Sequence, residues 1–432
     1  MKYVIIGNST AAVAAAEAIR TADREGLMTI ISDEPHHTYS RPLISYYLFG
    51  RTDENKMKYR GADFYEKNGI IPMLGNKVVG IDASAKLVIL ENGTHINYEK
   101  LLIATGSRPA IPPIKGLQRN NVFNFIKLDD ARLIEKYAVK GSKAVVIGAS
   151  FSGLKAVECL VERGVSVTTV DIADRLMPRL LDASSSLMVE KVLADRKVRV
   201  ILQTSVVSIE GGKGPDSDAE SVIIRSADGR QEILPCAFAV VATGVAPNIG
   251  FLANSGVKTN RGILVDDKMA TNIKDIYAAG DVAEVFDHYS SKNAVIATIP
   301  SAFEQGEAAG LSMAGLDRKY RSSPVINSMP LFDITVMGAG ITESLLGTET
   351  IIRQKTGNGV TKDSYMKFVL AENHLVGYLF VNEASRAGIY TDIIRNGIDI
   401  APFRENLGSD EFGFLSMPSS VRQGMLYAGI ET

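Results

Sequence analysis

The sequence has few cysteines and no long apolar run. Cys159 and Cys236 are its only cysteines, and their spacing matches no zinc or redox motif. A disulfide framework is therefore excluded, and an iron–sulfur cluster held by this chain alone is not expected. No uninterrupted apolar run approaches the ~20 residues that a membrane-spanning helix needs. The scarcity of cysteine favours a reducing compartment. A strand-like pattern starts at Met1 and leaves no room for a signal peptide, so a cytoplasmic protein is predicted.

The sequence also has no large excess of positive or negative charge, because its net charge is only −2. A chain without a large electrostatic field is not expected to bind nucleic acid or an anionic membrane. The five histidines follow no metal-ligand spacing, so no metal site is expected. The 432 residues exceed what one ordinary core holds, which predicts two or three domains.

One pattern begins at the N-terminus. An apolar run at residues 2–6 stops at Gly7, and an alanine-rich stretch without helix breakers follows. A second apolar run at 28–31 ends in Ser32-Asp33-Glu34. This order predicts strand, tight turn, helix and strand, a βαβ unit that requires a parallel sheet covered by helices.

The same order returns in the middle of the chain. An apolar run at residues 143–147 stops at Gly148, a helical stretch follows at 154–164, and a strand at 165–170 ends in Asp171. Two units of this kind predict two nucleotide-binding domains.

Later segments extend both halves. Each half contains an apolar strand that ends in Ala-Thr-Gly, at residues 101–106 and 239–244, and a further strand ends at Gly280-Asp281. A helix is predicted from about Pro300 to Ala314, with Thr298 as its cap. After Pro324 apolar and polar residues alternate up to residue 400, with a helical stretch at 384–397, which predicts a third, α+β domain.

The two glycine turns carry the chemistry. A dinucleotide turn uses glycine for a tight bend and for close approach to a pyrophosphate, which binds at the start of the following helix. Serine occupies the middle position in both turns, where its hydroxyl either donates to phosphate or crowds it. The alternative is a tight βα turn that binds nothing. The predicted phosphate-binding residues are Gly7, Ser9, Thr10, Ala11 and Ala12 in the first turn, and Gly148, Ser150, Phe151 and Gly153 in the second.

An acid after the second strand of each unit is placed to bind a ribose. Asp171 would accept a hydrogen bond from a 2′-hydroxyl and repel a 2′-phosphate, which favours NADH over NADPH. Arg175 lies nearby and leaves NADPH open. In the first unit Asp33 and Glu34 compete for this role, and Glu34 is favoured.

These features together resemble the pyridine-nucleotide-disulfide oxidoreductase superfamily over nearly the whole chain. The segment TNIKDIYAAGDVA at 271–283 is the most specific of them, and DRLMP after Asp171 is another. The resemblance implies an α/β fold with two Rossmann-like domains of the glutathione-reductase type. The FAD-binding domain would comprise 1–115 and 245–324, with an NAD-binding domain at 116–244 inserted in it and a C-terminal cap or dimerisation domain at 325–432.

The resemblance also assigns the cofactors, FAD to the first turn and NAD(H) to the second. Asp281 would bind the ribityl chain of FAD, and Val78 would offer its backbone to the adenine unless it is plain core. The remaining residues implied in the two sites are Thr105, Gly106, Gly280 and Thr298 for FAD, and Thr243 and Gly244 for NAD.

The segment Tyr39–Leu43 looks like that of NADH:rubredoxin reductases and of the flavin portion of NADH-dependent nitrite reductases. By this resemblance Arg41 would pair with the FAD pyrophosphate, and Pro42 would lie near the flavin ring. Related coenzyme A disulfide reductases and NADH oxidases carry a redox cysteine at the position of Pro42. Because thiol–disulfide exchange requires a thiolate, a flavin–cysteine relay is not expected here, and Cys159 and Cys236 are interpreted as core thiols.

One residue departs from the pattern. Many relatives carry glutamate two residues after the last glycine of the second turn, facing the nicotinamide, and this chain has Lys155 there. Lysine either alters nicotinamide placement or points to solvent. No catalytic residue is certain, and Pro42 and Lys155 are the candidates near the flavin.

The predicted protein is an FAD-dependent NADH oxidoreductase. Hydride would pass from nicotinamide C4 to flavin N5, and electrons would leave to a rubredoxin, a ferredoxin or an iron–sulfur subunit. The alternatives are an NADH oxidase that uses oxygen, a flavin-bound NADH sensor or scaffold, and a dedicated subunit of a larger complex. A homodimer through the C-terminal domain is compatible with the resemblance.

Overall fold

The computed structural model describes residues 1–214, 217–358 and 362–427, and the chain forms two compact units. The first unit contains Met1–Pro112, Ile126–Arg132 and Gly244–Ser323, and the second contains Pro113–Phe125, Leu133–Thr243 and Pro324–Thr432. The predicted three-domain division stays a prediction.

The first unit is built on a parallel sheet of five strands. Their order is β19-β7-β1-β2-β3, and every neighbouring pair is parallel. The inner strands are almost wholly buried, which explains their continuous apolar runs. The strands are β1 (Lys2–Ile6), β2 (Leu27–Ser32), β3 (Ile70–Leu74), β7 (Lys100–Ile103) and β19 (Ile276–Ala278).

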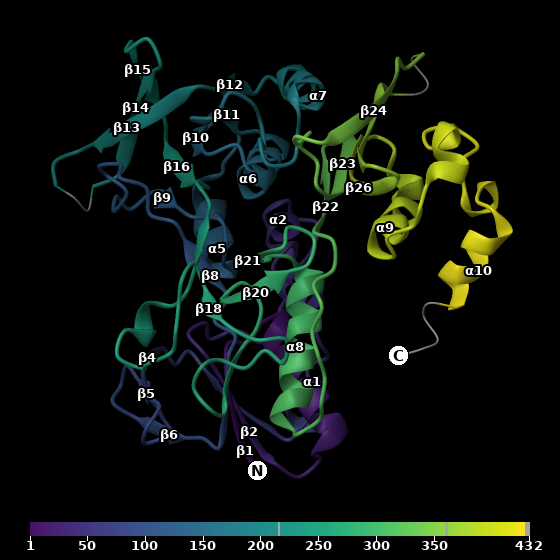
Figure 1. Ribbon diagram of the computed structural model, residues 1–432. Coiled ribbons are helices and arrows are strands. Elements are labelled where there is room, and N and C mark those ends of the chain that lie inside the picture. Colours follow the sequence, from purple (N-terminus) through teal and green to yellow (C-terminus); the bar gives the residue numbers. More distant parts are fainter. Residues whose placement is uncertain (215–216, 359–361, 428–432) are drawn as a thin grey trace. The chain divides into compact units, whose positions relative to one another are not determined.

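Two helices of this unit, α1 (Thr10–Ala22) and α8 (Ile299–Met313), lie side by side (Figure 1). A Cβ on Gly306 would lie 2.2 Å from the Ala11 carbonyl oxygen, and one on Gly310 would lie 2.4 Å from that of Ala15. The backbones touch because glycines face alanines four residues apart on both helices. Since Gly306 meets Ala11 and Gly310 meets Ala15, the helices run in the same direction and their N-termini are neighbours.

Smaller elements complete the first unit. Three short sheets are β4 (Val78–Asp82) with β5 (Leu87–Leu90) and β6 (His95–Asn97), β8 (Ser107–Pro109) with β17 (Val245–Pro247), and β18 (Ile263–Leu264) with β20 (Ala283–Asp287) and β21 (Lys292–Ala294). The helices are α2 (Leu43–Leu48), α3 (Glu54–Met57), α4 (Phe64–Lys67) and the 3-10 turn Gly250–Leu252.

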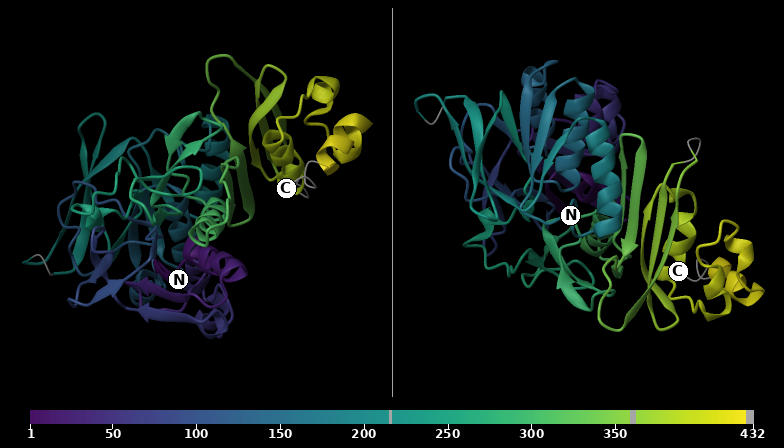
Figure 2. Two further views of the ribbon diagram at one scale, coloured as in Figure 1. Left: turned by 60° about the horizontal axis from the view of Figure 1, so that its bottom comes forward. Right: turned by 90° about the horizontal axis from the view of Figure 1, so that it is seen from above.

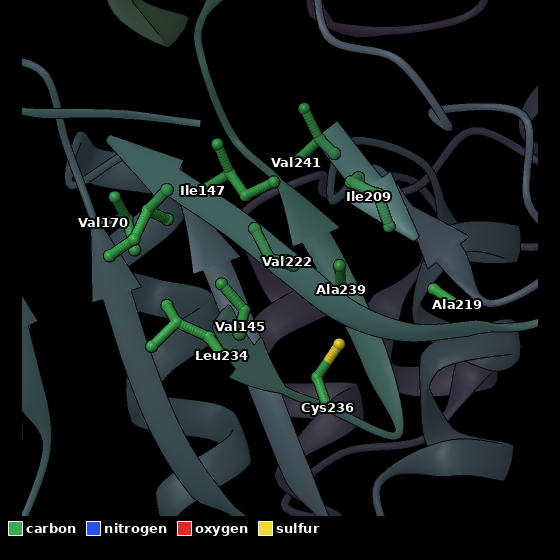
Figure 3. Close-up of a cluster of buried hydrophobic side chains, with 11 residues drawn as sticks. Val145, Ile147, Val170, Ile209, Ala219, Val222, Leu234, Cys236, Ala239 and Val241 are labelled. Carbon is green, nitrogen blue, oxygen red and sulfur yellow. The ribbon is translucent and has the colours of Figure 1, made fainter. Parts of the chain in front are cut away.

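The second unit contains another five-stranded parallel sheet, in the order β12-β11-β10-β16-β9. An antiparallel sheet, β13-β14-β15, packs against it, and Figure 3 shows the buried side chains of both sheets, among them Val145, Val222 and Cys236, in one cluster. The elements are β9 (Val122–Phe123), β10 (Lys143–Ile147), α6 (Phe151–Glu162), β11 (Ser166–Val170), α7 (Ala183–Asp195), β12 (Arg199–Ile201), β13 (Thr204–Gly211), β14 (Ala219–Ser226), β15 (Gln231–Pro235) and β16 (Phe238–Val241). Helix α5 (Leu128–Tyr137) begins in the first unit and ends in the second.

The C-terminal part of the second unit is an antiparallel sheet with helical segments beside it (Figure 2). This confirms the antiparallel strands predicted after Pro324. The strand order is β22-β23-β26-β25-β24, formed by β22 (Ile326–Leu331), β23 (Ile334–Gly340), β24 (Thr348–Lys355), β25 (Ser364–Ala371) and β26 (His374–Val381). The helical elements are the 3-10 turns Ala384–Arg386, Ala401–Asn406 and Phe414–Ser416, and helices α9 (Ala387–Arg395) and α10 (Ser419–Tyr427).

Both βαβ units occur where the sequence predicts them, and the α/β class with two Rossmann-like sheets and a C-terminal α+β part is confirmed. The residues at the predicted C-terminal boundary, 428–432, lie outside the described residues. Over the part of the chain that the structure describes, no helix combines the length and the apolar character needed to cross a membrane.

Candidate dinucleotide sites

The first glycine turn is closed by backbone contact. Gly7 has φ +126°, and a Cβ on it would lie 2.1 Å from the carbonyl oxygen of Ala104. Only glycine fits this bend, because any side chain would collide with the neighbouring strand. Ser9 is the N-cap residue of α1, and its side chain makes no capping hydrogen bond. The N–H groups at the start of α1 are therefore left available to a phosphate.

Glu34 and Asp33, the two candidate acids of the first unit, differ in burial. Glu34 is buried, whereas Asp33 is exposed and pairs with Lys127 at 2.7 Å. The two Glu34 carboxylate oxygens accept hydrogen bonds from Arg41 Nη2 at 2.5 Å and from the Tyr39 hydroxyl at 2.6 Å. Asn8, Ser9 and this trio line one small cavity beside the first turn.

Charge holds this trio together. Burial acts to lower the pKa of Arg41, but the neighbouring Glu34 carboxylate outweighs it and the pKa is raised. Burial also raises the pKa of Tyr39, so its hydroxyl stays a donor. Arg41 Nη1 donates further to the Ile126 carbonyl at 3.2 Å. Arg41 and Glu34, predicted to bind pyrophosphate and ribose, thus lie together, and those roles stay predictions.

The strand end at Gly280-Asp281 faces the same corner of the first unit. A Cβ on Gly280 would lie 3.2 Å from the Ala11 Cβ and 3.7 Å from the Ala302 Cβ, so this turn meets the starts of α1 and α8. The Asp281 carboxylate accepts a hydrogen bond from the Ser107 hydroxyl at 2.7 Å. Three backbone features predicted to hold FAD therefore converge.

Other predicted FAD residues occupy defined places. Thr105 donates its hydroxyl to the Asn248 carbonyl at 2.9 Å, and Gly106 has φ +63°. Thr298 caps α8 as predicted, with its hydroxyl accepting from Ser301 N–H at 3.4 Å. Pro42 is exposed at the start of α2.

Other residues of the first turn and of the neighbouring sheet complete the set. Thr10 is the first residue of α1, and Ala11 and Ala12 are buried behind it. Val78 is half-buried at the start of β4 and pairs with Leu90, and its contact with adenine stays a prediction.

The second glycine turn repeats the construction of the first. A Cβ on Gly148 would lie 2.4 Å from the Ala242 carbonyl oxygen, and one on Gly153 would lie 2.0 Å from that of Gly148. Ser150 is the N-cap of α6, but its hydroxyl donates to the Ala242 carbonyl at 3.1 Å and caps nothing. The start of α6, at Phe151, is therefore also left without a side-chain cap.

Asp171 is fixed beside this turn. Its carboxylate accepts from Ala149 N–H at 2.6 Å and from Ala173 N–H at 2.8 Å, so it stands at the end of β11 next to the start of α6. Arg175 donates to the Leu181 and Pro178 carbonyls and pairs with Asp174. An arginine used in this way is not arranged to receive a 2′-phosphate, which supports NADH. The neighbouring Thr243 and Gly244 are exposed at the end of β16.

Lys155 does not project into solvent. Its side chain is 17% exposed, and its ammonium pairs with the buried Glu158 and binds the Pro330 carbonyl at 3.1 Å. Glu158 also accepts from Phe332 N–H at 2.5 Å. The pair fixes the turn after β22 to α6, and a role at the nicotinamide stays a prediction.

Neither thiol is available for redox chemistry. Cys159 is fully buried in α6 and Cys236 is 7% exposed beside β16. Burial raises the pKa of Cys159, and it raises that of Cys236 to about 11. A thiol that stays protonated at neutral pH is a poor nucleophile. Neither cysteine forms a disulfide.

Sequence reasoning missed several supporting residues. Ser107 contacts Asp281 across 174 residues, and Gln305 contacts Gly280 across 25. Glu158 pairs with Lys155 on the same helix, but it also binds the Phe332 N–H, 174 residues away. The contacts of Gly306 with Ala11 and of Gly310 with Ala15 were also missed, although the sequence carries a signal for them. The spacing of Gly306 and Gly310 on α8 matches the small residues of α1, which is typical of closely packed helices.

The geometry agrees with comparisons to known proteins. The family model described as pyridine nucleotide-disulphide oxidoreductase matches residues 1–306. The chain belongs to this family. The epsilon subunit of an NADH-dependent phenylglyoxylate dehydrogenase from Aromatoleum evansii is 30% identical over 408 residues, 93% of each chain.

Two further relatives support the same assignment. The NADH-rubredoxin oxidoreductase of Clostridium acetobutylicum is 28% identical over 387 residues, 89% of this chain and 92% of the relative. The solved structure of an NAD-dependent persulfide reductase from A. fulgidus superposes with a TM-score of 0.86 at 26% identity, covering 100% of this chain and 84% of the other. The protein is an oxidoreductase that uses FAD and NAD(H).

The residues present fit these cofactors. Both glycine turns leave no room for a side chain, and both following helices start without a side-chain cap. By contrast α7 is capped by Asp182 and α8 by Thr298. Uncapped N–H groups beside a crowded glycine are what a bound pyrophosphate satisfies.

Proposed function

We propose that this oxidoreductase passes electrons from NADH through FAD to a small electron-transfer protein, without a cysteine relay. When bound, the cofactors supply the hydride transfer, so the chain needs no acid–base residue for that step. Relatives named as rubredoxin reductases support an acceptor of the rubredoxin or ferredoxin class. The partner is a small electron-transfer protein, and its assignment to the rubredoxin or ferredoxin class is part of the proposal.

The observation that carries the proposal is the state of the two thiols. Both are buried with raised pKa values, and no cysteine precedes Cys159 in the sequence. Pro42 stands exposed at the start of α2, where a relay would need a sulfur atom. Disulfide substrates require a thiolate beside the ring, so the electrons are expected to leave directly.

The chain's own residues would bind and orient. Gly7 and the start of α1 would hold the FAD pyrophosphate, Asp281 the ribityl chain, and Glu34 the adenosine ribose, with Arg41 neutralising charge nearby. Gly148, Gly153 and Asp171 would hold NADH in the same manner.

The direct test is anaerobic stopped-flow reduction of the FAD-loaded protein by NADH, followed by rubredoxin, ferredoxin and oxygen in separate mixings. We expect rapid bleaching of the flavin absorbance and fast reoxidation by one of the proteins. Failure of NADH to bleach the flavin contradicts the proposal. Faster reoxidation by oxygen than by either protein would establish an NADH oxidase instead.

A second candidate is a dedicated subunit of a larger enzyme complex. The relative that is a phenylglyoxylate dehydrogenase subunit covers almost the whole chain, which favours this candidate. It predicts rapid bleaching by NADH but slow reoxidation by both rubredoxin and ferredoxin. A homodimer through the C-terminal segment stays a prediction, and analytical ultracentrifugation of the FAD-loaded protein tests it.

A further inference from the structure

Gln305 is a buried polar side chain that none of the predicted contacts uses. It lies in the middle of α8, and none of its surface is exposed. Its Oε1 accepts a hydrogen bond from the Gly280 N–H at 2.8 Å. Burying an amide is unfavourable unless it forms hydrogen bonds, so a glutamine at this depth points to a specific partner.

That partner is the turn that precedes Asp281. Gly280 has φ +81°, and the start of α1 and the start of α8 both lie within van der Waals distance of a Cβ built on it. The Cβ atoms of Ala11 and Ala302 enclose the turn by contact alone. The hydrogen bond from Gly280 to Gln305 adds a directional link, and it ties the turn to α8.

The other end of the side chain reaches the segment after α8. Among the residues that the structure describes, Gln305 Nε2 and the Tyr320 hydroxyl have no hydrogen-bond partner by distance and angle. Burial raises the pKa of Tyr320, while the side chains of Gln305 and Ser301 act to lower it, so the phenol lies beside both. Tyr320 is itself anchored, because its N–H donates to the Asp267 carbonyl at 2.6 Å.

We propose that Gln305 is a positioning residue for the flavin, holding the Gly280-Asp281 turn at a fixed place relative to the N-terminus of α8. The proposal rests on the proposed function, in which Asp281 binds the ribityl chain. The positive end of α8 would stabilise the negative charge of the reduced ring. If the turn shifts against α8, FAD binds more weakly and its midpoint potential becomes more negative.

The test compares three variants. Gln305→Met keeps the side-chain volume and removes the acceptor. Gln305→Glu keeps an acceptor, and burial favours the neutral carboxyl that can replace the amide. Ser312→Ala is the matched control on the same helix, because the Ser312 hydroxyl donates to the Arg318 carbonyl, at 3.4 Å, and not to the Gly280 turn.

We expect Gln305→Met to raise the FAD dissociation constant about tenfold and to make the midpoint potential more negative, since one buried hydrogen bond is lost. Gln305→Glu and Ser312→Ala should stay close to the unmodified protein. The proposal is overturned if Gln305→Met keeps the original affinity and potential. It is also overturned if Gln305→Glu loses as much as Gln305→Met.

A measurement without FAD separates this inference from the proposed function. Hydrogen exchange of residues 276–283 in the FAD-free protein should be faster in Gln305→Met and unchanged in Ser312→Ala. Unchanged exchange in Gln305→Met overturns the inference, whether or not the protein binds FAD. If Gln305→Met does not fold, Gln305→Leu takes its place, because it also removes the acceptor of the Gly280 N–H; the same rise in the FAD dissociation constant is expected, and the absence of a rise overturns the inference.

Discussion

Replacement of Gly306 by alanine tests whether the contact of α1 with α8 organises the FAD site. The new Cβ would lie 2.2 Å from the Ala11 carbonyl oxygen and 2.8 Å from the Ala11 Cα. Favourable contacts between carbon atoms begin near ~3.5 Å, so the helices must separate by about 1 Å. Both obstructing atoms are backbone, and no side chain can turn aside to relieve the contact.

The expected magnitude follows from two opposing effects. Overpacking of a close contact destabilises by about 1–3 kcal/mol, and the upper part of that range applies when backbone must move. Alanine is favoured over glycine inside a helix by about 1 kcal/mol. The net loss for Gly306→Ala should therefore be about 2 kcal/mol. FAD affinity should also fall, because the two helix starts and Gly280 no longer converge.

The assay is denaturant unfolding of the FAD-free protein followed by far-ultraviolet circular dichroism, with FAD binding measured separately. Gly388→Ala is the matched control, since Gly388 lies in α9 and a Cβ there would meet nothing within 4 Å. That change should be neutral or stabilising by up to about 1 kcal/mol. Unfolding of Gly306→Ala at the same or a higher denaturant concentration than the original protein would refute the reasoning.

Three further predictions concern the second unit. Asp171→Asn should raise the KM for NADH in steady-state kinetics and bring it closer to the KM for NADPH, because the ribose of NADH loses a charged acceptor. An unchanged ratio of the two KM values would contradict the assignment of Asp171 to the ribose. Glu158→Gln should destabilise the protein by about 3–5 kcal/mol, since it leaves the ammonium of Lys155 buried without its counter-charge. The midpoint of urea unfolding measures this loss, and an unchanged midpoint would contradict the prediction. Burial raises the pKa of Cys236 to about 11 in the folded state, above the value of about 8.5 in the unfolded chain. The contribution of this protonated thiol to the stability of the fold is therefore complete below about pH 8.5 and is lost as the pH rises through 11. Iodoacetamide at pH 8 should therefore leave both Cys236 and Cys159 unmodified until the chain unfolds, and modification of the native protein would contradict their burial.

The fold and the places of the two glycine turns could be predicted because their signals are local. Gly7 and Gly148 each follow an apolar run and precede a helix, and that order alone determines a βα turn. The positions of Asp171 and Glu34 after the second strand of each unit follow from the length of a βαβ unit. Their burial and partners could not be predicted, because those depend on packing.

The supporting contacts could not be predicted because they join residues far apart in the chain. Lys155 offered two interpretations, and the Pro330 carbonyl that binds it comes from a strand 175 positions later. Gln305 resembles any other polar residue of a helix until the fold places Gly280 beside it. Contacts of this kind depend on three-dimensional register, which periodicity does not encode.

Helices α1 and α6 each follow a glycine turn and start without a side-chain cap, which has a practical consequence. Unsatisfied amide donors at a positive helix end attract whichever small anion the solvent offers. Sulfate or phosphate in a crystallisation or storage buffer will therefore compete with the dinucleotides, and apparent cofactor affinities will depend on the choice of buffer salt.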